Sequence, residues 1–165
     1  MVLGTPTGAT LGATTTHTLT IAASEASAAL AAPSYQAQLT VQGYDGAELA
    51  DFPVLVRLSP QTVDGFHYDT CKADGSDVVF VDENGEPLAY QLDTWNPSGE
   101  SLFWVKLPQL AKGKSFFVQW GGGPVTSSNA SGTWNANYAG VWHMGEASGV
   151  CANSTVHGSA YDATP

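Results

Sequence analysis

Residues 101–120 read SLFWVKLPQLAKGKSFFVQW, and this stretch decides the fold class. Its apolar residues form two short runs, Leu102–Leu107 and Ser115–Trp120, with the turn dipeptide Lys112-Gly113 between them. Side chains of a strand alternate between two faces, so the first run predicts a strand with two distinct surfaces. One surface carries Leu102, Trp104 and Lys106, and the other carries Phe103, Val105 and Leu107.

Four further short apolar runs precede this stretch: Gln36–Val41, Pro53–Leu58, Val78–Val81 and Leu88–Leu92. Turn dipeptides separate them, among them Asp45-Gly46, Asp64-Gly65, Asp74-Gly75 and Asn84-Gly85. No part of residues 36–122 keeps a helical period of 3.6 residues over three turns. Short strands spaced about ten to fifteen residues apart predict an all-β fold, an antiparallel β-sandwich or jelly roll.

The composition excludes several functional classes. The chain has 165 residues with 5 Lys+Arg and 15 Asp+Glu, for a formal net charge of −10. So few cations cannot form the basic surface that nucleic acid requires, and we expect no nucleic acid partner. No run approaches about 18 strongly apolar residues, so we expect no membrane insertion.

The charged residues divide the chain. Residues 1–35 contain one, Glu25, and residues 123–165 contain two, Glu146 and Asp162; the other seventeen lie between 36 and 122. We therefore predict a terminal strand within 1–22, a linker at 23–35, a β-sandwich domain at 36–122, and a loop with the truncated start of another domain at 123–165. The expected terminal strand includes Thr18–Ile21, and Ala139–Met144 is a candidate strand in the last part.

Two tryptophans are the candidate ligand contacts. Trp95 is expected at a strand end beside Asp93 and Asn96, and Trp104 lies within a strand next to Lys106 on the same face. An exposed indole can stack on a sugar ring while a neighbouring Asp or Asn bonds the hydroxyls. The alternative is that both indoles pack in the core.

Three acidic residues and two cysteines are further candidates. Asp74, Asp77 and Asp82 lie near glycines and could offer oxygen ligands to calcium, or their loops could simply be hairpin turns. No other cofactor is expected. Cys71 and Cys151 could form a disulfide if the protein is exported, or they could remain free thiols.

Motifs that carry catalysis are not evident. The sequence has no G-x-S-x-G or H-E-x-x-H motif and no phosphate-binding glycine loop, and its four histidines show no zinc-ligand spacing. We therefore expect a protein that is not an enzyme.

Three segments resemble known families. The middle of the chain resembles an uncharacterised bacterial domain family that recurs in large surface proteins and in chains named as MotA/TolQ/ExbB proton-channel family members. The motifs that carry this resemblance are DFPVLVRLS (51–59), KADGSDVVFVDENGEPLAYQLDTW (72–95), FWVKLPQL (103–110) and FFVQWGG (116–122). A proton channel needs membrane-spanning segments, so we do not expect that activity in this chain.

The two flanks are similar to parts of other modules. Leu3, Pro6, Ala9, Leu11 and Gly12, followed by Thr18–Ile21, look like the end of a Calx-beta repeat. Val141–Glu146 resembles the opening of a laminin-G or concanavalin-A-like lectin domain. These resemblances imply a modular protein that is secreted or attached to the bacterial surface, although the N-terminus shows no signal peptide pattern.

The sequence thus predicts a non-catalytic β-sandwich module for adhesion or carbohydrate contact, with surface glycans or neighbouring proteins as partners. The alternative is a structural spacer or a self-assembling subunit without a small-molecule ligand. Assembly could occur if Thr18–Ile21 adds as a strand to the sheet edge of another molecule.

Overall fold

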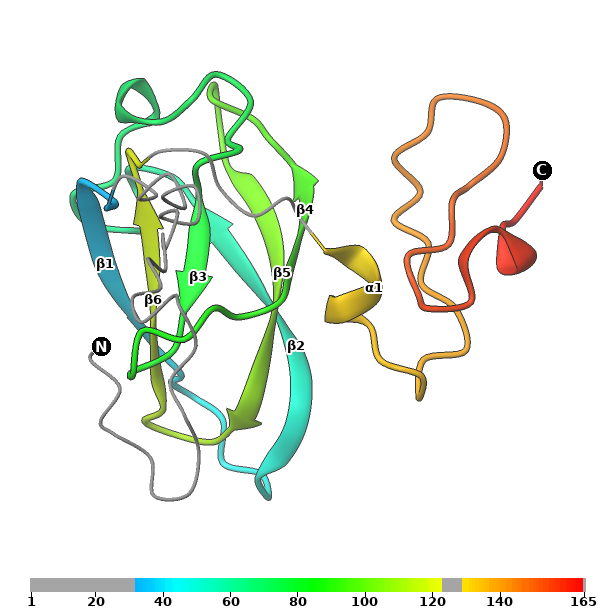
Figure 1. Cartoon of the computed structure of the whole chain (residues 1–165), viewed down its shortest axis with the longest axis horizontal. Coiled ribbons are helices and arrows are strands. Elements are labelled where there is room, and N and C mark those ends of the chain that lie inside the picture. Colours follow the sequence, from blue (N-terminus) through cyan, green and yellow to red (C-terminus); the bar gives the residue numbers. More distant parts are fainter. Residues whose placement is uncertain (1–31, 123–128, 165) are drawn as a thin grey trace, which may run out of the picture.

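A computed structural model describes residues 32–122 and 129–164. Two antiparallel three-stranded sheets face each other, and residues 129–164 lie beside one of them (Figure 1). The strands are β1 (Tyr35–Thr40), β2 (Leu49–Leu58), β3 (Val79–Val81), β4 (Tyr90–Thr94), β5 (Ser101–Leu110) and β6 (Ser115–Trp120). Short helical turns are η1 (Tyr68–Thr70), α1 (Ala130–Thr133) and η2 (Gly158–Tyr161). The predicted all-β sandwich is therefore confirmed, and each of the six strands predicted within residues 36–122 has a counterpart.

Each sheet is built around one of the two strands in residues 101–120. Strand β5 is the centre of the sheet β2-β5-β4, and β6 is the centre of the sheet β1-β6-β3. β2 pairs with β5 along its whole length, from Leu49 opposite Leu110 to Leu58 opposite Ser101. The hairpin around Lys112-Gly113 thus connects the central strands of the two sheets, and the other four strands are the edge strands of those sheets.

The alternation along β5 and β6 creates the core. Inward side chains of both strands are buried, whereas those at alternate positions are partly exposed. The inward set consists of Phe103, Val105, Leu107, Phe116, Val118 and Trp120. Phe80 of β3 lies between the layers, with its ring centroid 5.3 Å from that of Phe103 and 5.4 Å from that of Tyr90. The predicted assignment of the two faces of β5 is correct.

The long loop after β2 closes one end of the core. Phe66 is completely buried, and its ring meets Trp120 edge to face with centroids 5.2 Å apart. The Tyr68 hydroxyl lies 2.7 Å from the Leu58 carbonyl oxygen and accepts a hydrogen bond from the Ser101 N–H at 3.1 Å. This loop is therefore held to the sheet by both apolar burial and hydrogen bonds.

Two predicted strands differ from the structure. A strand was predicted at Leu88–Leu92, but β4 begins only at Tyr90. Leu88 lies outside β4 because its N–H donates to the Phe80 carbonyl oxygen of β3. Ala139–Met144 is not a strand. Met144 has a φ of 57°, which is incompatible with extended backbone, and the Val141 N–H bonds the Asn153 side chain.

Residues 129–164, here called the docked segment, lie against the outer side of the sheet β2-β5-β4 (Figure 1). The Asn129 N–H donates to the Tyr90 carbonyl oxygen at 2.7 Å, and α1 contacts β4 and β5. A buried side chain, Asn153, organises the far part of the segment. Its Oδ1 accepts from the N–H groups of Val141 and Thr155, and its Nδ2 donates to Thr155 Oγ1 and the Gly158 carbonyl oxygen.

In the parts of the chain that the structure describes, the helices are too short to cross a membrane. The Calx-beta-like strand and the linker fall on residues outside the described ranges, except for the last residues of the linker.

A matched pair of substitutions tests the core. Phe80→Ala should lower the free energy of unfolding by about 3–5 kcal/mol, because it leaves a cavity between the two sheets. Phe52→Ala in β2, where the side chain is 38% exposed, should cost about 1 kcal/mol or less. Chemical denaturation followed by tryptophan fluorescence measures both, and equal losses would contradict the assigned core.

Candidate functional site

A polar and aromatic junction joins the outer face of the sheet to the docked segment. Asp93 and Gln91 of β4 and Trp104 of β5 contribute from the sheet, and Trp134 and His143 contribute from the docked segment. Gln91 lies opposite Trp104 in the strand register, and Asp93, at the irregularity where the pairing of β4 with β5 shifts by one residue, accepts from the same Trp104. The junction is therefore built by the strand register.

Hydrogen bonds link the members of the junction. The Trp104 indole N–H donates to Asp93 Oδ2 at 3.1 Å, and the Trp134 indole N–H donates to Gln91 Oε1 at 2.6 Å. His143 lies between the two acceptors, with Nδ1 3.0 Å from Asp93 Oδ2 and Nε2 3.0 Å from Gln91 Oε1. Gln91 Nε2 donates to Ser154 Oγ at 2.9 Å. Both sides thus contribute donors and acceptors: Trp134 of the docked segment donates to the sheet, and Gln91 of the sheet donates to Ser154.

Ring contacts surround these bonds. The centroids of Trp104 and Trp134 are 5.1 Å apart, and Trp134 also meets Tyr138 edge to face at 5.2 Å. Trp134 is 5% exposed, so its docking removes a large apolar surface from water. Trp104 is half-buried in this contact and does not present a free indole.

Trp95 lies at the inner side of the sandwich end. Its ring packs against Tyr68 and Phe103, and its indole N–H donates to the Ala73 carbonyl oxygen at 2.8 Å. Gly75 has a φ of +69°, and a Cβ there would lie 2.5 Å from the Trp95 ring, so only glycine fits beneath it. Asn96 caps the following turn by accepting from the Ser98 N–H. Of the four predicted ligand contacts, Asp93 and Trp104 lie together, and Trp95 and Asn96 lie at another place.

The three acidic calcium candidates serve separate turns. Asp77 is buried and accepts from the N–H groups of Lys72 and Gly121. Hydrogen bonds from Ser76 lower the pKa of Asp74. A hydrogen bond from the Glu86 N–H, supported by Asn84, lowers the pKa of Asp82. Among residues 32–122 and 129–164, no three His, Cys, Asp or Glu side chains converge as metal ligands would.

The disulfide between Cys71 and Cys151 is not formed, and both cysteines are free thiols. Cys71 packs against the core, and its thiol donates to the His67 carbonyl oxygen at 3.6 Å. Cys151 instead pairs through its backbone with Ala163 inside the docked segment. Burial, with the charges of Asp77 and Asp69, raises the pKa of the Cys71 thiol to about 12.

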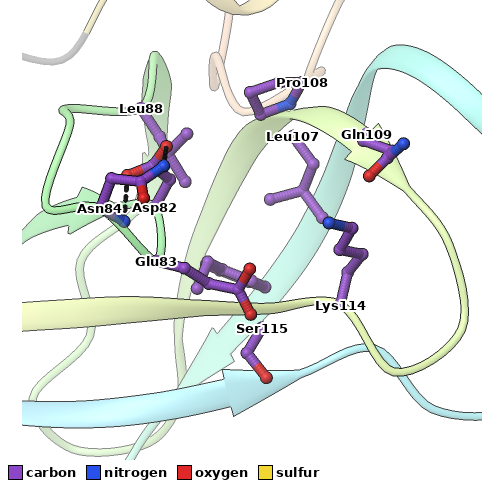
Figure 2. A pocket seen from close by; sticks show the side chains of 10 residues that line it. Asp82, Glu83, Asn84, Leu88, Leu107, Pro108, Gln109, Lys114 and Ser115 are labelled. Atoms are coloured by element: carbon purple, nitrogen blue, oxygen red, sulfur yellow. Dashed lines mark hydrogen bonds between the residues drawn. The ribbon is translucent and has the colours of Figure 1, made fainter.

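A small open pocket lies where the turn after β3 approaches the hairpin between β5 and β6 (Figure 2). Glu83 and Asn84 line it from the turn, and Gln109, Lys114 and Ser115 line it from the hairpin. Its volume of about 170 Å³ is below the usual range of about 300–1,000 Å³ for ligand sites. The pocket is therefore smaller than a usual ligand site.

A larger groove of about 360 Å³ runs between the edge strands β1 and β2. The Lys106 N–H donates to the Ala89 carbonyl oxygen on the β4 side of β5. Lys106 therefore makes no backbone hydrogen bond to Pro53, its partner on β2, and the Pro53 backbone faces the open edge of the sheet. Pro53 has no N–H to offer there, and the Arg57 carbonyl oxygen already accepts from Thr62 Oγ1. This edge is thus poorly suited to accept another strand, whereas the addition of Thr18–Ile21 to a different edge stays a prediction.

Residues 74–139 match the family model described as Domain of unknown function (DUF2341). None of the curated proteins matches the chain, and no solved structure matches it. The match supports the predicted resemblance of the middle segment to an uncharacterised family. The Calx-beta, lectin-like and proton-channel contexts stay predictions.

The DUF2341 match extends past the Gly121–Gly123 break and includes α1 and Trp134. The predicted site residues do not include three members of the junction: Gln91, Trp134 and His143. No spacing rule connects them, because they come together only when the docked segment folds back on β4. The family match continues beyond the glycine-rich break to residue 139. This continuity is the signal that indicates that Trp134 belongs with the sandwich.

The reactivity of Cys71 tests its burial. In a Cys151→Ser variant, the remaining thiol should react with an aromatic disulfide reagent at pH 8 at least about a hundredfold more slowly than glutathione, because so little thiolate is present. Reaction in guanidinium chloride should restore the ordinary rate. A fast reaction in the native protein would contradict the raised pKa.

Acid titration tests the turn that Asp82 supports. The pKa of this carboxyl is lower in the folded protein than in the unfolded chain. Its contribution to the free energy of unfolding is therefore present at neutral pH and is lost as the pH falls through the acidic range. Asp82→Asn should therefore lose less Tm than the wild type between pH 6 and pH 3. Asp64→Asn, at an exposed position of another loop, is the control and should keep the wild-type slope.

Proposed function

We propose that this chain contains a non-catalytic β-sandwich module with a structural role, which holds the segment that follows it in a fixed position. The observation that carries this proposal is the junction on the outer sheet face. Across this junction the Trp134 indole N–H bonds Gln91, and His143 contacts both Asp93 and Gln91. The Gln91 amide also bonds Ser154 of the docked segment. Such pairing restricts the segment to one placement, because a shift would leave buried polar groups without partners.

The wider context of this role is also a proposal. The resemblance of the middle segment to modules of large surface proteins favours a secreted or surface-attached bacterial protein. In such a protein, a rigid module would act as a spacer that sets the orientation of its neighbour. The low number of cations is consistent with contact to proteins or neutral surfaces rather than to nucleic acid.

Adhesion through carbohydrate contact is the rival proposal. It needs the faces of Trp95 and Trp104 to be accessible, yet both side chains are half-buried and their N–H groups have internal partners. A glycan array probed with the wild-type chain tests this rival directly. Binding that is lost in Trp95→Ala or Trp104→Ala would support it, and no binding to any glycan would count against it.

The structural role predicts the effect of removing one ring of the junction. Trp104→Ala should weaken docking by about 2 kcal/mol, since the half-buried ring loses its contact with Trp134 and the hydrogen bond to Asp93. Amide hydrogen exchange in residues 129–164 should then accelerate at least about tenfold, while the strands keep their protection.

Phe52→Ala is the matched control, because Phe52 lies on the same sheet opposite Leu107, away from Trp104, and is 38% exposed. Its exchange pattern should equal that of the wild type. If the wild-type docked segment already exchanges as fast as an unfolded peptide, the structural proposal fails.

A further inference from the structure

We infer that docking of residues 129–164 takes up one proton at the contact between His143 and Asp93, so that the segment is held more tightly in mildly acidic than in alkaline solution. This inference rests on the proposed structural role of the junction and adds its regulation. It follows from which atoms of the junction can donate and which can only accept.

The orientation of the Gln91 amide is fixed by its neighbours. An indole N–H can only donate, and the Trp134 Nε1 lies 2.6 Å from the Gln91 Oε1. The Gln91 Nε2 donates on its other side to Ser154 Oγ at 2.9 Å. Exchanging the two ends of the amide would place its NH₂ group against the indole N–H, so Oε1 must be the atom that faces the docked segment.

His143 therefore meets an acceptor at each of its ring nitrogens. Nε2 lies 3.0 Å from Gln91 Oε1, which offers only lone pairs, so Nε2 must carry a proton to bond it. Nδ1 lies 3.0 Å from Asp93 Oδ2, which also accepts from the Trp104 indole N–H. A carboxylate at that position requires a proton on Nδ1 as well. If the proton lies on the Asp93 oxygen instead, the pair still holds the same number of protons.

The charges around the ring act on this proton in a defined way. β4 contributes Asp93, and the docked segment itself contributes Glu146, whose pKa is lowered mainly by the Ala152 N–H and to a smaller extent by His143. Both acids favour the charged ring. β5 contributes the neutral Trp104 and, two residues along the same face, Lys106. The positive charge of Lys106 disfavours the charged form of the His143 ring. The side chains of His143 and Asp93 are 17% and 20% exposed, so solvent screens the pair only in part.

Loss of the proton removes one bond from the docked state. A neutral imidazole has one N–H, so either Gln91 Oε1 or Asp93 Oδ2 would face a ring nitrogen lone pair at about hydrogen-bond distance. The released segment has no such conflict, because water can bond either nitrogen. Histidine changes charge between about pH 5 and pH 8, so docking should weaken as the pH rises through that interval.

Nuclear magnetic resonance of the whole chain tests the inference at pH 5.5 and pH 8.5. Nitrogen shifts of the labelled histidines report the protonation of His143, and the indole N–H signals of Trp104 and Trp134 report docking. We expect a doubly protonated His143 in the docked state and a docking equilibrium roughly tenfold weaker at the higher pH, as expected for the loss of one partly buried hydrogen bond. A neutral His143 with equal docking at both pH values would overturn the inference and leave the structural role intact.

Two variants separate this effect from other titrations. His143→Gln should make docking independent of pH over this range, because its amide does not titrate. His157→Gln, in the same segment and stacked on Tyr161, should keep the wild-type pH dependence. An unchanged pH dependence in His143→Gln would overturn the inference. A segment that is undocked at both pH values in the wild type would overturn the structural role together with it.

Discussion

Strand β5 is buried along its inner face and is contacted by the docked segment at Trp104 on its outer face, and the rest of the structure depends on this. Its inward residues Phe103, Val105 and Leu107 close the core against β3 and β6, while Trp104 on the outward face packs under Trp134. A strand of an ordinary two-layer sandwich has one face exposed to solvent. Here the outward face of β5 needs a partner, and the docked segment supplies it from the same chain.

Alternation and turn residues were sufficient to predict the sandwich, because each depends on interactions within a few residues. Leu102 to Leu107 alternates regularly, so the residues of β5 were divided correctly between its two faces. The junction was not predictable in the same way. Whether Trp104 faces water or protein depends on residues 30 and more positions away, and the sequence alone left its environment open. Ala139–Met144 was misjudged for a related reason, because the backbone N–H of Val141 bonds the Asn153 side chain and not a neighbouring strand.

The polar half of the junction explains why the docked segment has a defined position. Apolar contact between Trp104 and Trp134 would tolerate many placements of the two rings. The half-buried carboxylate of Asp93 and amide oxygen of Gln91 favour those placements that bring donors to them, since a shielded acceptor without a partner is unfavourable. Burial thus supplies the attraction, and hydrogen bonding selects the register between segment and sheet.

The four hydrogen bonds of the Asn153 amide have a practical consequence for production of this protein. Asn153-Ser154-Thr155 matches the acceptor pattern for N-linked glycosylation. A secretory host that glycosylates nascent chains would place a sugar on Nδ2, the atom that donates to Thr155 and Gly158 in a buried site. The bulky glycan could not be accommodated there, so the far part of the docked segment would lose its organising side chain. A bacterial host, or an Asn153→Asp change made with this cost in mind, avoids that outcome.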